Sequence, residues 1–600
     1  MKSASTTPST ANAKISIGYG KRKNSALFTS LSQIGLMNAQ IYNPLYDTFF
    51  KLNESNRNTT APAQNEYLTS IKHATPLTQF SSNVICDATM VSHKENRNRN
   101  GHIFIKYIPL LNSVKYICGI YDKESDTVIP SGPNDVTHSK ILDANNAAYV
   151  DALFVYLSSL SLTQLGFTHG LYYYGSFLGY KKNFTFDILD DLEELVDSEY
   201  FQTNKNGDLF TVDDYSEYIN CSDDDSNNKR TPIKILGTCD ETPDVIDLDL
   251  DDDLIGTPVP VSPQTSLELV YSNNNDDGVM DNASDNNIQE NISLVSGNDD
   301  SDDNSNISVT DEEWDSNSDD SGFGSCNHSS IGDEEIGSNS SSISSDGEED
   351  CVRGVIAKFP VNAVCMERCD GTFEDLMASD KTTNDVWVSA LMQIIMSLIA
   401  YKKLFLLVHN DLHIGNVMWV STSQQFLYYK YNAVYYKVPT YGRIFKIIDF
   451  GRAIYTIQGH RFCSDDFANK SDAYGQYNTE PFYNPKKPRI EPNHSFDLCR
   501  FACSVFTCMA DDVCEIPEIV AQLPAFSIIA DWCKDDNGNN ICYKRNGVER
   551  YPGFKLYKMI ARVVHNHVPE VQLERNEFKH FRVKKVSNNK IMNLDVFTPQ

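Results

Sequence analysis

The chain has 600 residues and a formal net charge of −31, with 82 acidic against 51 basic residues. Residues 241–350 contain 30 Asp and Glu and no Lys or Arg, so nearly all of the net charge lies in this one segment. The remainder is close to neutral, which argues against a nucleic-acid-binding surface built on a basic excess.

The N-terminal 75 residues are polar and rich in Ser, Asn and Thr. This composition predicts a flexible segment over residues 1–75. The N-terminus lacks the apolar stretch of a secretory signal peptide, and no run in the chain reaches the ~18 apolar residues needed to cross a bilayer. We therefore expect no membrane association.

Residues 76–218 predict a small β-rich part that contains one helix. Two strand-like runs, NVICDATMVS at 83–92 and HIFIKYI at 102–108, are followed by a helical stretch at 144–162. A further β-rich run, GLYYYGSFLGY, covers 170–180.

Residues 219–350 are dominated by Asp, Ser, Asn and Gly, in runs such as SDDNSNISVTDEE. Low apolar content with charge of one sign cannot offset the chain entropy lost on folding, so the composition predicts a long disordered acidic insertion. Within it, DVIDLDLDDD at 244–253 is a short aliphatic strand-former flanked by acid. It resembles a SUMO-interacting motif, which adds as a strand to a partner's sheet edge, although a plain solvated linker has the same composition.

Ordered structure is predicted again from residue 351. The run VNAVCMER reads as a strand, so 351–371 would complete the β-rich part. Residues 384–403 carry apolar side chains on one helical face and end in two lysines, which favour a helix C-terminus. A mixed β region that starts with LFLLVH at 404–409, and then a mostly helical portion, make up the rest of 372–600.

The 15 cysteines include two pairs spaced four residues apart, Cys365 with Cys369 and Cys499 with Cys503. No two C-x-x-C motifs with metal-site spacing occur. Cys499 and Cys503 lie in an apolar, helix-like run, where buried free thiols are a better interpretation than a metal site. This pattern is typical of a reducing compartment.

Two short segments carry the residue types that phosphoryl transfer needs. HNDLHIGNVMWV places Asp411 and Asn416 in the spacing H-x-D-x-x-x-x-N, and KIIDFGRA places Asp449 at the end of an apolar strand. The reaction needs a carboxylate that accepts the proton of the substrate hydroxyl, and oxygen ligands that hold Mg²⁺ on the phosphates. Asp411 suits the first role, and Asn416 and Asp449 suit the second.

Together the two segments resemble the catalytic loop and the metal-binding loop of protein kinases. The wider sequence is similar to the serine/threonine kinases of large nucleocytoplasmic DNA viruses, and HNDLHIGNV also resembles the loop of haspin-type kinases. The resemblance is specific over 355–570 and looser over 80–180. The blocks that carry it are VPTYGRIFKIIDFGRAIY, SDAYGQYN, SFDLCRFACSVF and ERYPGFKLYKMIARVVHNH.

The resemblance implies an α+β fold of two lobes, β-rich and then α-rich, with the acidic insertion between the fourth and fifth strands of the first lobe. It further implies that Lys106 pairs with the α- and β-phosphates of ATP, with Lys115 as a rival. Asp151 would be the acidic partner of this lysine, although a glutamate is usual there. The hinge whose backbone binds adenine would comprise Met366, Glu367, Arg368 and Cys369, and Asp497 would hold the backbone of the catalytic loop.

Three features depart from the family pattern. No glycine occurs between residues 36 and 100, so the Gly-rich phosphate loop is missing from its expected place before Lys106. Asn410 replaces the arginine that usually precedes the catalytic aspartate. His413 stands at the lysine position two residues after Asp411, and with an ordinary pKa of roughly 6.5 its charge there would be conditional.

The expected function is therefore the Mg²⁺- and ATP-dependent phosphorylation of serine or threonine in a protein substrate, in the cytoplasm of a host cell or packaged in a virion. Three alternatives stay open. The missing glycine loop favours a catalytically inactive kinase-like scaffold. The D-L-H-x-x-N pattern also occurs in small-molecule kinases of the aminoglycoside and choline type. Finally, the acidic tract favours an interaction protein.

Overall fold

The computed structural model describes residues 13–21, 25–50, 52–92, 97–219, 351–379, 381–586 and 590–600. The acidic segment with its SUMO-like motif lies outside the described residues, so its disorder and its partner stay predictions. The described chain is a mixed α+β structure, with a β-rich N-terminal region and most of its helices later.

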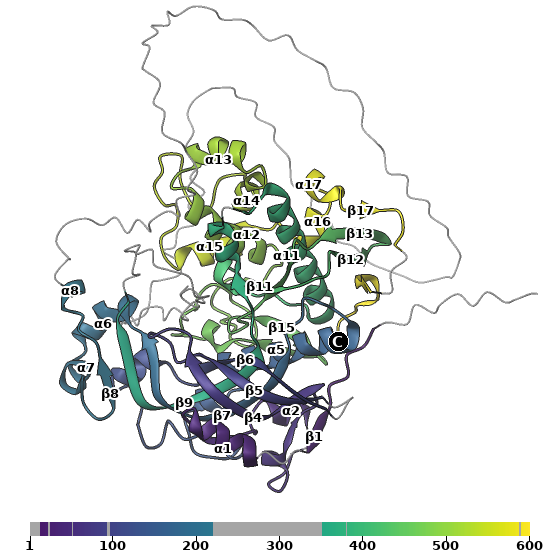
Figure 1. Cartoon of the computed structure of the whole chain (residues 1–600). Helices are drawn as coiled ribbons and strands as arrows, with labels where there is room; N and C mark the ends of the chain where they lie inside the picture. The colour runs from purple at the N-terminus through teal and green to yellow at the C-terminus, as the bar shows by residue number, and fades with distance from the viewer. Residues whose placement is uncertain are drawn as a thin grey trace, which may run out of the picture. The chain divides into compact units, whose positions relative to one another are not determined.

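A large antiparallel sheet dominates the N-terminal region, in the strand order β2-β7-β9-β6-β5-β4, with β8 paired to one end of β9 (Figure 1). Strands β4, β5 and β6 follow one another along the chain, and helix α5 (Ala147–Leu165) separates them from β7 and β9. The strands are β2 (Leu36–Gln40), β4 (Glu66–Pro76), β5 (Val84–Ser92), β6 (Arg97–Pro109), β7 (Tyr173–Asp187), β8 (Phe210–Val212) and β9 (Arg353–Glu367).

Alternation along β6 decides which side chains reach the helix side of the sheet. Ile103, Ile105 and Tyr107 are buried on one face. Because successive side chains of a strand point to opposite faces, Lys106 lies on the other face. Helix α5 contacts β7 and β9, and nearly all of its side chains from Ala147 to Ser161 are buried.

Residues 13–75 differ from the flexible segment that the composition predicted. They form β1 (Tyr19–Lys21), α1 (Ser25–Gln33), α2 (Tyr46–Phe49) and β3 (Thr60–Pro62), besides β2 and β4. Leu27, Leu31 and Leu36 are buried in the core. The segment is polar overall, so its composition does not show the face that these apolar residues share.

Short helices fill the connections around the sheet. They are α3 (Ser113–Ile117), α4 (Ser139–Leu142), α6 (Leu192–Asp197), α7 (Glu199–Asn204) and α8 (Ser216–Ile219). Strand β8 lies beside the start of β9, with Val212 opposite Gly354, so the described chain on either side of the acidic segment meets in one sheet.

The later part of the chain combines small sheets with helices. Strands β10 (Gly371–Thr372), β11 (Val417–Ser421) and β14 (Arg443–Ile447) form one sheet, and β15 (Ile454–Ile457) pairs with β16 (His460–Cys463). The hairpin β12 (Phe426–Tyr431) and β13 (Val434–Pro439) is widened by β17 (Arg582–Val583) and β18 (Ile591–Asn593). The helices are α10 (Phe373–Ala378), α11 (Asn384–Phe405), α12 (Phe496–Met509), α13 (Ile516–Gln522), α14 (Phe526–Trp532), α15 (Lys555–Val563), α16 (Pro569–Gln572) and α17 (Asn576–Lys579).

Helix α11 is the central helix of this part. It ends at Leu406 in the left-handed conformation, so the run LFLLVH is a helix end and a single β-bridge at Val408 rather than a strand. Among the described residues it alone is long and apolar enough to cross a membrane, but 89% of its most apolar window is buried inside the protein. Such burial is typical of a core helix.

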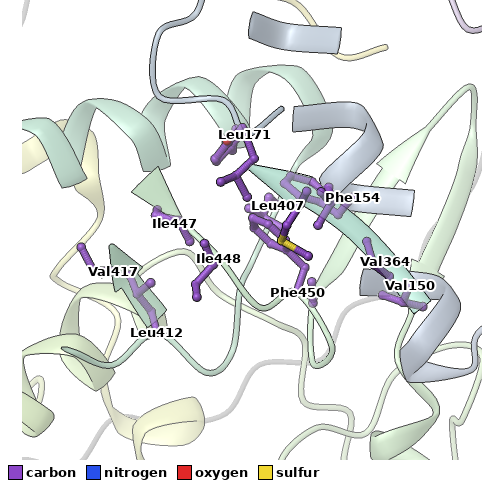
Figure 2. Close-up of a cluster of buried hydrophobic side chains, with 14 of the residues drawn as sticks. Val150, Phe154, Leu171, Val364, Leu407, Leu412, Val417, Ile447, Ile448 and Phe450 are labelled. Carbon is purple, nitrogen blue, oxygen red and sulfur yellow. The ribbon is translucent and has the colours of Figure 1, made fainter. Parts of the chain in front are cut away.

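Apolar side chains from both parts of the chain meet in one cluster (Figure 2). Phe450, in the loop after β14, packs against Phe154 of α5 with ring centroids 4.3 Å apart. Val364 of β9 and Leu407 belong to the same cluster. This packing positions the loop after β14 next to the helix that carries Asp151.

Candidate active site

Lys106 lies between two carboxylates that come from distant parts of the chain. Its Nζ is 2.9 Å from Asp151 Oδ2 on α5 and 2.7 Å from Asp449 Oδ1 in the loop after β14. The side chain of Lys106 is 14% exposed and that of Asp151 is 1% exposed. Burial alone would lower the pKa of Lys106, but the charges of Asp151 and Asp449 outweigh it and raise that pKa. The ammonium therefore stays charged.

Asp151 also holds the loop after β14. Its Oδ1 accepts a hydrogen bond of 2.9 Å from the backbone N–H of Phe450. Although aspartate is one methylene shorter than glutamate, its two oxygens reach Lys106 and Phe450 at once. The rival residue, Lys115, is on α3, where its Nζ donates to the carbonyl of Lys470 at 3.0 Å. The structure thus brings Lys106, rather than Lys115, to the predicted acids.

A buried acid on α12 fixes the loop that contains Asp411. Asp497 accepts hydrogen bonds of 2.9 Å from the backbone N–H groups of His409 and Asn410, one at each oxygen. The ring of His409 bonds the carbonyl of Ile448 at 2.8 Å, which ties this loop to the segment before Asp449. Asp497 therefore has the positioning contacts that the sequence predicted.

Asn416 and Asp449 lie on segments that are hydrogen-bonded to each other. The Asn416 side-chain amide donates to the carbonyl of Asp411 at 2.9 Å, and Ile448 N–H donates to the carbonyl of Asn416 at 3.0 Å. Asp449 has a left-handed backbone with φ of 60°, a conformation that L-residues adopt rarely and that is common at functional sites. The two candidate Mg²⁺ ligands thus project from neighbouring segments.

Asp411 is surrounded by cationic and hydrogen-bonding groups. Burial by itself would raise its pKa, but Arg452, His413 and Arg500, with a hydrogen bond from Tyr557, lower it to about 2. The phenol of Tyr557 donates to Asp411 Oδ1 at 2.9 Å, and Arg452 Nη1 lies 3.6 Å from Oδ2. Asp411 is therefore ionised at neutral pH.

His413 is a neutral imidazole at neutral pH. Burial lowers its pKa to about 4, against the opposing charges of Asp411 and Asp449. Its Nδ1 accepts a hydrogen bond of 3.2 Å from Gly415 N–H. An ordinary histidine pKa predicted that the charge of His413 would depend on the pH near neutrality. In its buried position the ring is instead neutral, and its hydrogen bond with Gly415 shapes the loop.

The predicted hinge begins in the last two residues of β9, Met366 and Glu367, and continues into the loop after it. The carboxylate of Glu367 is bound by Lys446 Nζ at 2.7 Å and by the N–H of Tyr172 at 3.1 Å. Cys369 is 6% exposed. The side chains of Glu367 and Cys369 therefore face protein. The last residues that pair β6 with β9 are Ile103 and Glu367, so the backbone of Arg368 and Cys369 lies beyond the paired part of the two strands.

The turn between β4 and β5, where a glycine-rich loop was expected, is built from polar side chains. Asn83 Oδ1 accepts a hydrogen bond of 2.9 Å from Tyr107 N–H on β6, and Ser82 Oγ accepts one of 2.6 Å from Thr185 N–H on β7. Asn83 is 7% exposed. The turn is thus fastened to the sheet next to Lys106 by side chains instead of glycine backbone.

Three further residues complete this site: the sequence pointed to Asp465 and Arg452 only as charged groups of the segment after Asp449, and it missed Tyr557. Tyr557 and Arg452 contact Asp411, and Asp465 accepts a hydrogen bond of 2.9 Å from Ala147 N–H at the start of α5. Arg452 directly follows Asp449–Gly451, but nothing in the local pattern shows which acid it faces. The charge of Asp465 predicts a cationic partner but not which one, and Tyr557 carries no signal at all, because the partners of both are far away in the sequence.

Comparison of the chain with models of known protein families, and with curated protein sequences, finds no match. The site is therefore interpreted from its own geometry.

Proposed function

We propose that this protein is a protein kinase that transfers the γ-phosphoryl group of ATP to serine or threonine hydroxyls. One observation carries the proposal: Lys106 is paired at once with Asp151 on the buried helix and with Asp449 after β14. In protein kinases a strand lysine paired with a helix acid, and an aspartate that holds Mg²⁺, must both be in place for catalysis. Asp411 and Asn416 stand on the adjoining loop.

The strand order supports the same fold. The meander β4-β5-β6 carries the lysine on its third strand, α5 carries the acid, and the two long strands β7 and β9 follow before the chain enters its helical part, with β2 and β8 as additional strands of the sheet. A two-lobed kinase fold has this succession of elements, with the lysine on the third strand and its acid on the following helix. The acidic segment would then interrupt the domain between its fourth and fifth strands.

The residues fit Mg²⁺ and ATP by their chemistry. Asn416 and Asp449 would hold the metal, since Mg²⁺ prefers oxygen ligands, and Lys106 would bind the phosphates. When bound, Mg²⁺ supplies positive charge that stabilises the phosphoryl oxygens. Lys106 remains charged in its buried position, as phosphate binding requires.

Asp411 would orient the attacking hydroxyl and accept its proton. A carboxylate with a pKa of about 2 is a weak base, so it positions the hydroxyl by a hydrogen bond and takes the proton late in the reaction. Tyr557 occupies one oxygen of Asp411 and Arg452 lies near the other. A substrate hydroxyl would therefore bind at Oδ2 or displace the phenol.

The test is a transfer assay with radiolabelled ATP and Mg²⁺ on the full chain. Generic acidic and basic proteins serve as acceptors in one arm, and choline and an aminoglycoside serve in the other. We expect label on serine and threonine of protein acceptors. Asp449→Asn should lower turnover by at least roughly 10²-fold, as loss of one charge-stabilising group does elsewhere, and should melt normally. The control is Asp87→Asn, an exposed carboxylate on β5.

A catalytically inactive scaffold is the second candidate, favoured by the turn between β4 and β5 that lacks glycine. It predicts that ATP with Mg²⁺ raises the melting temperature while no acceptor is labelled. Label only on choline or the aminoglycoside would assign a small-molecule kinase. Normal turnover in Asp449→Asn would contradict the metal assignment.

A further inference from the structure

Four cysteines from separate parts of the chain converge among the later helices. Cys499 and Cys503 lie one turn apart on α12, Cys533 directly follows α14, and Cys542 lies in the loop after it. The sulfur atoms of Cys503, Cys533 and Cys542 all lie within 4.8 Å of one another. The thiol of Cys499 is within hydrogen-bond reach of Cys503. All four residues are at most 3% exposed.

This geometry fits metal binding better than pairwise thiol contacts. In a tetrahedral zinc centre with Zn–S distances of about 2.3 Å, neighbouring sulfurs lie about 3.8 Å apart. Three sulfurs mutually within 4.8 Å reach that arrangement by small side-chain adjustments. A disulfide would use two of the sulfurs and leave the others without a role.

The loop that follows Cys533 and contains Cys542 is poor in apolar side chains. Residues 534–553 read KDDNGNNICYKRNGVERYPG. Two hydrogen bonds shape it: Ile541 N–H donates to the carbonyl of Cys533 at 2.7 Å, and Cys542 N–H donates to Asn540 Oδ1 at 2.8 Å. Gly538 and Gly547 adopt positive φ values of 84° and 75°. Such a segment buries little apolar surface of its own, and a metal ion can replace the missing core.

Arg500 supplies positive charge beside the cluster. It lies on α12 between the two cysteines of that helix and acts electrostatically on Cys499, Cys503 and Cys542. Four thiolates around Zn²⁺ carry a net charge of −2, so a neighbouring guanidinium offsets part of the excess charge.

We propose that Cys499, Cys503, Cys533 and Cys542 bind a structural zinc ion. Binding replaces the four thiol protons, which are released to solvent, by four Zn–S bonds. A site closed by four protein ligands has no open position for substrate, so its role is to fix α12, α14 and the loop 534–553. The sequence favoured buried free thiols for Cys499 and Cys503, because Cys533 and Cys542 are more than two dozen residues away from them.

The site would also stiffen the helix that holds the Asp411 loop. Asp497 lies on the first turn of α12, directly before the cysteine pair. Zinc removal should therefore increase amide hydrogen exchange at His409 and Asn410, whose N–H groups donate to Asp497. This readout needs no catalysis, so failure of the kinase proposal would leave it intact.

The first test is zinc content and coordination in the full chain purified without added metal. We expect one zinc per chain, and X-ray absorption should give four sulfur neighbours at about 2.3 Å. Cobalt substitution should produce a thiolate-to-metal charge-transfer band. Substoichiometric zinc with all four thiols reacting freely, nitrogen or oxygen neighbours, or a disulfide within the cluster under reducing conditions would each overturn the proposal.

The second test uses variants. Cys503→Ser and Cys542→Ser should each lower bound zinc at least about tenfold. A loss of about this size already follows when a residue that only hydrogen-bonds to a metal ligand is removed, and these two residues are ligands themselves. Cys86→Ser is the matched control, since Cys86 is also buried but lies in β5. If the cluster variants do not fold, a strong chelator on the unaltered chain should still lower its melting temperature. Unchanged zinc content in both cluster variants, or no effect of the chelator on melting, would overturn the assignment.

Discussion

Lys106 is the single residue on which the geometry of the candidate site depends most. Its ammonium separates two carboxylates, Asp151 and Asp449, that would otherwise repel each other in a largely buried place. Removing one partner of a buried ion pair costs far more than the pair contributes, because a charge is left buried without compensation.

Lys106→Met should therefore lose both stability and activity. We expect the free energy of unfolding to fall by roughly 3–5 kcal/mol and phosphoryl transfer to be abolished. Lys115→Met is the matched control: Lys115 donates to one carbonyl near the surface, so its loss should cost less than about 1 kcal/mol. Chemical denaturation of the two variants distinguishes them, and a larger loss in Lys115→Met would contradict the assignment of Lys106.

At the scale of elements, the segment after Asp449 docks onto the start of α5 by unmodified acids. Asp465 Oδ1 accepts the N–H of Ala147 at 2.9 Å, and its Oδ2 lies 3.2 Å from Lys140 Nζ. Arg452 pairs with Asp411, and its Nε lies 3.9 Å from Asp466. In many kinases such contacts are made by a phosphate group, which orders this segment.

Asn410, the residue before Asp411, also holds the segment after Asp449 without a phosphate group. Asn410 is buried and accepts a hydrogen bond of 2.7 Å from the phenol of Tyr477, while its amide donates to the carbonyl of Arg452 at 2.9 Å. A neutral amide cannot form the charge-assisted pair that an arginine makes with phosphate. Here the side-chain amide of Asn410 hydrogen-bonds directly to the segment after Asp449.

We therefore predict that the proposed kinase activity needs no activating phosphorylation of this protein. Protein made in bacteria and treated with phosphatase should transfer phosphate from the first turnover, and Ser471→Ala should behave the same way. Asp465→Ala should slow transfer and cost about 1 kcal/mol of stability, as loss of a helix cap does. A lag that shortens with enzyme concentration, or activity lost on dephosphorylation, would contradict this prediction.

At the scale of the whole molecule, buried histidines couple stability to pH. Burial lowers the pKa of His169, His413 and His494 to about 4 from the ordinary value of 6.5. Between these pH values the unfolded chain binds protons that the folded chain does not, so stability falls as the pH drops from 6.5 to 4. Each histidine contributes up to about 3 kcal/mol to this loss. Asp191, whose pKa burial raises to about 8, opposes the trend.

His169→Gln should flatten the pH dependence. His169 is fully buried, with its two ring nitrogens 2.7 Å from the carbonyl of Phe445 and from the phenol of Tyr429. The variant should be less stable than the parent at pH 7 and should lose less stability between pH 6.5 and pH 4. Urea denaturation across this range measures the slope, with His565→Gln at the surface as control. An unchanged slope would show that folding does not lower the pKa of His169.

Deleting residues 241–350 should leave turnover on a short peptide nearly unchanged. The described chain on either side of the acidic segment meets in one sheet, where Asp213 N–H donates to the carbonyl of Arg353 at 3.0 Å. Shortening a connection between neighbouring strands changes mainly the loop-closure entropy, which varies slowly with length. Turnover and melting temperature of the deletion variant test this, and failure to fold would show that the segment packs on the rest of the protein.

The sequence by itself determined the two loops at the centre of the site. Asp411, Asn416 and Asp449 could be proposed as site residues because phosphoryl transfer would need those residue types at fixed spacing within short contiguous segments. The strands β5 and β6 and the helices α5 and α11 followed from apolar patterns, which are also local. Asp497 and Lys106 needed the family resemblance in addition.

Only the tertiary structure decided which residues act on these loops. Tyr557 reaches Asp411, Asp465 reaches α5, and Cys533 and Cys542 reach α12, each across a long stretch of sequence. The buried apolar residues of 13–75 likewise share a face only once the sheet has formed. A local sequence pattern shows which side chains of one segment are buried together. The role of a polar or thiol group depends on its partner, and folding brings that partner from elsewhere in the chain.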